Sequence, residues 1–123
     1  MNQIMIYIAS PMTGLWGSAH LFAAKGVVTG FGDLSADNRR IITMEWIVEG
    51  VALISIAAFV ATVTIIQPEA LLSQSVYVVA VVNLIALTVV SLFTGFRVAL
   101  LPFRLCPFIF CASAASIVFG VWL

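Results

Sequence analysis

Residues 51–95 read VALISIAAFVATVTIIQPEALLSQSVYVVAVVNLIALTVVSLFTG and contain one charged side chain, Glu69. The sequence on either side of Gln67-Pro68-Glu69 is long and apolar, and a helix that crosses a bilayer needs about 20 such residues. Pro68 and its polar neighbours are typical of a break between helices. The stretch therefore predicts two membrane-spanning helices joined by a short turn.

The rest of the chain has the same character. Of 123 residues, 63% are hydrophobic and 8% charged, whereas a soluble domain has about 25% charged residues. The net charge is zero and no run of Lys or Arg is present, which argues against nucleic-acid binding. We expect an all-α membrane protein, a single domain over residues 1–123, with four transmembrane helices in a compact antiparallel bundle and the lipid bilayer as its main partner.

The predicted helices cover approximately residues 3–28, 36–66, 69–95 and 107–123. Small residues recur at four-residue spacing on one side of the first helix and of the last helix: Ser10, Gly14 and Ser18, and Ala112, Ser116 and Gly120. Small side chains let helix backbones approach closely in membranes. We therefore expect the first and last helices to pack together through these two series.

The positive charges indicate an orientation. All five lie in or beside two of the connections: Lys25, Arg39, Arg40, Arg97 and Arg104. Short loops rich in Lys and Arg favour the cytoplasmic side. The sequence thus predicts a multi-pass protein of a bacterial inner membrane, with the two arginine-bearing loops cytoplasmic and both termini outside.

One group of polar residues is a candidate ligand or proton site. His20 and Glu45 each lie about nine residues from the turn between the first two helices, so we expect them at the same depth. Glu49 follows Glu45 by one helical turn, and Asn83 of the third helix reaches a similar zone. Such a group could relay protons, bind a cation or bind a metal through two oxygens and one nitrogen.

A structural role is the alternative for the same residues. Glu45 and Glu49 would then form ion pairs with lysine or arginine at the interface. His20 would form a hydrogen bond within the protein, and Asn83 would form one to another helix. The sequence contains no HExxH or ExxH spacing. We therefore predict no catalytic residues, no metal site and no cofactor.

The two cysteines, Cys106 and Cys111, are five residues apart in the last hydrophobic run. On a helix this spacing turns the two thiols about 140° apart, so no disulfide between them is expected. Without a neighbouring His they are a poor metal signature. Both are interpreted as small apolar residues.

The length and four-helix layout resemble small bacterial membrane proteins of the DoxX-like kind and, more distantly, small multidrug transporters. The latter carry a glutamate in their first helix, and residues 3–28 of this chain contain no acidic residue. The resemblance covers layout alone, so it implies no functional residue here.

Three function classes remain. The small-residue series and the absence of a catalytic motif favour an accessory or scaffold protein with a polar His/Glu pocket near the cytoplasmic face, acting within a larger membrane complex or a homo-oligomer. The alternative is a proton-coupled or cation/small-molecule transporter that acts as an oligomer and uses the His20 and Glu49 region. An enzyme, such as an intramembrane oxidoreductase using the two cysteines, is the least favoured class.

Overall fold

Helices account for nearly all of the computed structural model, which describes residues 1–123 and contains no strand. The elements in order are α1 (Gln3–Gly30), α2 (Ala36–Ile66), α3 (Leu71–Phe93), the short 3-10 helix η1 (Gly95–Arg97) and α4 (Leu101–Trp122). The all-helical class is therefore confirmed. Three of the four α-helices, α2, α3 and α4, are long and apolar enough to cross a membrane.

The helix ends follow local sequence signals. The side-chain oxygen of Ser35 accepts a hydrogen bond from the Asn38 backbone N–H and caps α2, as its residue type favours. Gly32, in the preceding loop, has a φ of 77°, which glycine adopts at little cost. Helix α4 begins at Leu101, ahead of the predicted residue 107. Two prolines suit a first helical turn; Pro102 occupies it, and Pro107 lies inside the helix.

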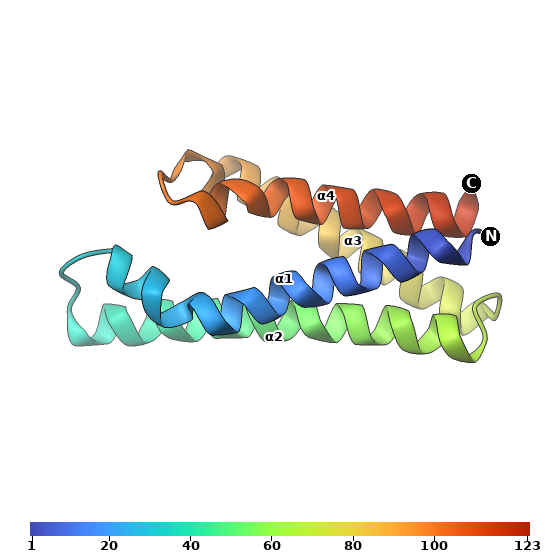
Figure 1. Ribbon diagram of the computed structural model, residues 1–123, viewed down its shortest axis with the longest axis horizontal. Coiled ribbons are helices and arrows are strands. Elements are labelled where there is room, and N and C mark those ends of the chain that lie inside the picture. Colours follow the sequence, from blue (N-terminus) through green and yellow to red (C-terminus); the bar gives the residue numbers. More distant parts are fainter.

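Figure 1 shows α1 and α2 as a hairpin, with α4 beside the first half of α1 and α3 behind. Both termini and the α2–α3 turn lie at one end. The α1–α2 and α3–α4 connections lie at the other end, and the α1–α2 hairpin extends beyond the α3–α4 connection. All five lysine and arginine residues belong to this second end, because they lie in these connections or in the adjoining helical turns.

Helices α1 and α2 approach closely at a pair of glycines. A Cβ atom built on Gly17 would lie 2.7 Å from the Gly50 carbonyl oxygen, and one built on Gly50 would lie 2.8 Å from the Gly17 oxygen. The Ser10 hydroxyl donates to the Ala57 carbonyl at 2.7 Å. The small-residue side of α1 thus faces α2, and the prediction that it faces α4 is wrong.

Helix α1 nevertheless contacts α4 near the two termini. The Asn2 backbone N–H donates to the Gly120 carbonyl at 2.6 Å, and a Cβ on Gly120 would lie 2.6 Å from Ile6 Cγ1. Ala112, at the other end of the predicted α4 series, is exposed. The two helices therefore do pack together, as predicted, and Gly120 of the predicted α4 series lies in the contact. On α1, however, Gly120 meets Asn2 and Ile6 rather than the predicted small-residue series.

The main hydrophobic core takes residues from all four helices, such as Ile6, Leu53, Leu84 and Phe110. Helices α2 and α3 make the least contact of any adjacent pair of α-helices. Near their turn they are joined by a buried hydrogen bond between the hydroxyls of Thr64 and Tyr77 at 2.9 Å. Farther along, an apolar groove of about 310 Å³ separates them.

Candidate functional site

His20 lies where α1 meets α2 and α4, and its side chain is only 2% exposed. Its Nδ1 is 2.8 Å from the Trp16 carbonyl oxygen one turn earlier. A carbonyl only accepts, so Nδ1 carries the proton and donates. The ring stacks on Trp46 of α2 with centroids 4.4 Å apart, and Trp16 meets its edge at 5.7 Å. Two indoles and one hydrogen bond therefore fix the orientation of the imidazole.

Glu49 of α2 faces the other ring nitrogen. Its Oε1 is 3.7 Å from His20 Nε2, and its side chain is 32% exposed. This distance is too long for a direct hydrogen bond, so the contact is electrostatic when the imidazole is charged. Neither Glu49 nor Glu45 pairs with a lysine or arginine; the remaining ion pair joins Arg40 to Asp37.

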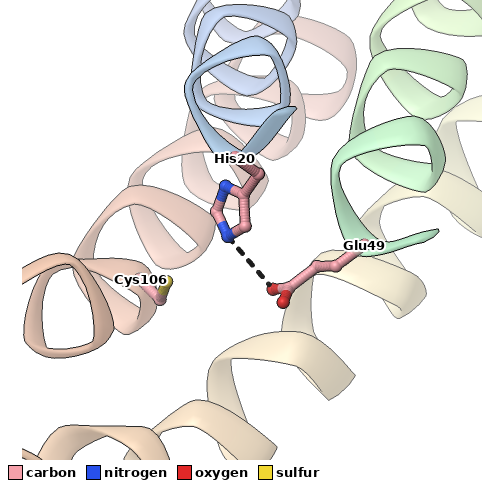
Figure 2. A group of neighbouring side chains, drawn as sticks. All are labelled: His20, Glu49 and Cys106. Carbon is pink, nitrogen blue, oxygen red and sulfur yellow. Dashed lines mark ion pairs between the residues drawn. The ribbon is translucent and has the colours of Figure 1, made fainter. Parts of the chain in front are cut away.

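Cys106 of α4 completes the group. Ligand atoms of His20, Glu49 and Cys106 all lie within 4.8 Å of one another, and the three side chains extend from three helices toward one space (Figure 2). The buried Cys106 thiol donates to the Pro102 carbonyl at 3.3 Å. Cys111 is exposed, and neither cysteine forms a disulfide.

Of the four residues expected at the site, the structure brings two together, His20 and Glu49. Glu45 is exposed and forms no ion pair. Asn83 is exposed on α3, and its Nδ2 donates to Val79 of its own helix at 2.8 Å. The expected bond from Asn83 to another helix is therefore absent within this chain.

Cys106 is the site residue that sequence reasoning misses. The last predicted helix begins at residue 107, after this cysteine. Counting depth from the predicted helix ends therefore does not place Cys106 near His20. In the structure α4 begins earlier, and the α1–α2 hairpin projects beyond the α3–α4 connection. Cys106, one turn into α4, therefore lies level with residues well inside α1 and α2. The signal that could have found it is the other proline, Pro102, which suits a helix start.

Two crevices reach the site from the α3 side. One, of about 390 Å³, is lined by Trp46, Glu49, Phe103 and Cys106 together with residues of α3. The other, of about 430 Å³, includes Glu45 and Glu49. The carboxylate is therefore accessible from outside the helices, whereas the imidazole is enclosed.

The site can hold a cation or exchange a proton, because it combines an imidazole, a carboxylate and a thiol with one accessible member. Comparison of the chain with protein-family models, with curated proteins and with solved structures finds no match.

Proposed function

We propose that this chain is an integral protein of a bacterial inner membrane and acts as an accessory or scaffold subunit of a larger membrane complex. All four helices span the bilayer as a compact antiparallel bundle in this proposal. The arginine-bearing connections face the cytoplasm, and both termini lie outside. The His20–Glu49 site then lies in the cytoplasmic half.

The exterior of the protein supports membrane insertion. Large apolar side chains are exposed on every helix, among them Phe22, Leu71, Phe93 and Phe119. A soluble monomer rarely exposes apolar patches larger than a few hundred Å², and lipid is the solvent that such a surface suits. Basic residues cluster at one end of the molecule, as the positive-inside rule requires of an inserted protein.

Helix α1 is not among the helices that qualify as membrane spans by length and composition. Its 28 residues extend about 42 Å at 1.5 Å per residue, which exceeds the ~30 Å hydrocarbon thickness. Its polar side chains Ser10, Thr13 and His20 are buried against the protein. These features support a fourth span whose polar side is shielded from lipid.

The environment of Asn83 is the main support for the accessory role. It lies midway along α3 and lines the apolar groove between α2 and α3, with an exposed carboxamide. Its bond to Val79 uses one amide hydrogen, so the carbonyl oxygen and the second N–H have no protein partner. Facing hydrocarbon in this state is unfavourable. A helix of another chain in the groove, hydrogen-bonded to Asn83, removes that cost.

The test replaces Asn83 by Leu, whose side chain has the same number and branching of heavy atoms and no polar group. Wild-type protein extracted from its native membrane in mild detergent should run as a complex larger than the chain alone. One interhelical hydrogen bond contributes about 0.6–2 kcal/mol, so Asn83→Leu should weaken the complex about 3- to 30-fold. Val82→Leu, at an exposed neighbour outside the groove, is the control. A wild-type particle of monomer mass, or equal effects of both variants, contradicts the role.

Transport is the second candidate, and the accessibility of Glu49 favours it. A carboxylate that reaches a crevice while pairing with an enclosed imidazole can alternate between two proton or cation partners. In reconstituted vesicles, Glu49→Gln should abolish the flux of protons or cations across the membrane. Glu45→Gln, one turn away and exposed, should leave this flux intact. Flux that is equal in wild type and Glu49→Gln excludes this site.

A further inference from the structure

His20 presents an unpaired nitrogen toward Glu49 and Cys106. Because Nδ1–H donates to the Trp16 carbonyl, a neutral ring has its lone pair on Nε2. That nitrogen is fully buried, forms no hydrogen bond, and points at the Glu49 carboxylate (Figure 2). Two electron pairs thus face each other across 3.7 Å. Such an arrangement calls for a cation between them.

The imidazole also has the support that metal ligands usually have. Histidines that bind metals commonly donate the other ring N–H to a backbone carbonyl or carboxylate, which fixes the tautomer and the direction of the ring. The Trp16 carbonyl provides this, and the stacked Trp46 ring holds the plane. His20 is therefore oriented before any ion arrives.

The spacing of the donor atoms suits a small tetrahedral ion. With bonds of about 2.0–2.3 Å, Zn²⁺ separates its ligand atoms by about 3.3–3.8 Å. Here His20 Nε2 and Glu49 Oε1 are 3.7 Å apart, and all three ligand atoms lie within 4.8 Å. A separation of 4.8 Å has to shorten by about 1.0–1.5 Å to reach that geometry, through rotation of the Glu49 and Cys106 side chains.

The chemistry of the donors selects the ion. Imidazole, carboxylate and thiolate together suit Zn²⁺, whereas Mg²⁺ and Ca²⁺ require oxygen ligands. Without the ion, the Cys106 thiol donates its proton in a hydrogen bond to the Pro102 carbonyl. Binding of Zn²⁺ displaces this proton and releases it to solvent. One thiolate, one carboxylate and a neutral imidazole then balance the two positive charges. A site with no net charge incurs the smallest desolvation cost inside a protein.

We propose that His20 Nε2, a Glu49 carboxylate oxygen and Cys106 Sγ bind one Zn²⁺ ion. The fourth position faces the crevice lined by Trp46, Glu49, Phe103 and Cys106. Three protein ligands with one open position are the arrangement of zinc sites that take a water molecule or another exogenous ligand. The site would use residues of α1, α2 and α4, so bound zinc would also join these helices.

The proposal is independent of membrane orientation and of the accessory role, because it concerns three side chains within one chain. Its test uses the full-length chain in detergent micelles, treated with a chelator, desalted and then titrated with Zn²⁺ or Co²⁺ alone. The expected result is one ion per chain. Co²⁺ should add a thiolate-to-cobalt charge-transfer band in the near ultraviolet.

Cys106→Ser should remove the charge-transfer band and weaken Zn²⁺ binding at least about tenfold, since even partners of metal ligands contribute about 10- to 100-fold. Glu49→Gln should weaken it similarly. The matched controls are Cys111→Ser on the same helix and Glu45→Gln one turn before Glu49, both at exposed positions. Both controls should bind as wild type does.

X-ray absorption of the wild-type zinc complex keeps the test decisive if a variant fails to fold. It should show one sulfur at about 2.3 Å and nitrogen or oxygen ligands at about 2.0–2.1 Å. Absence of stoichiometric zinc, a spectrum without sulfur, or wild-type affinity in a folded Cys106→Ser variant overturns the proposal.

Discussion

His20 uses its two ring nitrogens for different purposes. Nδ1 bonds its own helix, and Nε2 faces α2 and α4. The ring is buried among indoles whose own N–H groups, on Trp16 and Trp46, have no hydrogen-bond partner. So many buried polar atoms without partners in one place are uncommon in structural cores. The choice of residues in this region is therefore not explained by packing alone.

The coupling between His20 and Glu49 can be measured directly. In the presence of a chelator, a double-mutant cycle with His20→Gln and Glu49→Gln should give a coupling free energy of about 0.5–3 kcal/mol, because the pair is in contact and one partner is enclosed. The same cycle at the solvent-exposed pair Asp37 and Arg40 should give no measurable coupling. Reversible unfolding in mixed micelles provides the free energies. Equal coupling in the two cycles would show that His20 and Glu49 do not interact specifically.

Sequence reasoning identifies His20 and Glu49 because ionisable residues within apolar helices are few and conspicuous. Helix counting places Glu45 at the depth of His20, but it fixes depth only to within a turn, and the neighbour in the structure is Glu49, one turn farther along. In the structure Trp46 and Glu49 share the inner face of α2, and Glu45 falls outside it. Cys106 goes unrecognised because the last predicted helix begins at residue 107, after this cysteine, and because a cysteine in an apolar segment is usually a packing residue.

At the scale of elements, the α1–α2 contact depends on residues without side chains. Gly17 and Gly50 each place their backbone against the carbonyl of the other. The sequence identifies the small side of α1 correctly but assigns it to the wrong neighbour, because a helical wheel shows which side is small and not which helix covers it. The short loop of residues 31–35 makes α2 the natural partner.

Alanine substitutions test this contact. Gly17→Ala or Gly50→Ala forces a methyl group to within 3 Å of backbone atoms and should destabilise the protein by about 1–3 kcal/mol. Gly26→Ala is the control on the same helix, since a Cβ at this position meets nothing within 4 Å. It should be neutral or stabilising by up to about 1 kcal/mol, because alanine favours helix. Equal unfolding temperatures for the three variants would refute the close approach.

At the scale of the whole molecule, the helical class follows from composition alone, and the relative placement of the connections follows from having four antiparallel helices. The loose contact between α2 and α3 could not be predicted, because residues 51–66 of α2 and 71–93 of α3 contain no charged side chain that would show which sides of the two helices face each other. That looseness creates the groove beside Asn83 and the crevices that reach Glu49. Both proposed functions therefore depend on a feature of packing that the sequence pattern does not encode.

The central claim is an inserted protein with its basic end in the cytoplasm, and site-directed cysteine labelling tests it most directly. Single cysteines are placed at the exposed positions Asp33, Arg97 and Gln67, in a chain with both native cysteines replaced by serine. With a membrane-impermeant maleimide, Asp33→Cys and Arg97→Cys should react only from the cytoplasmic side, and Gln67→Cys only from outside. Labelling of Gln67→Cys from the cytoplasm, or of all three positions from one side, would contradict the account.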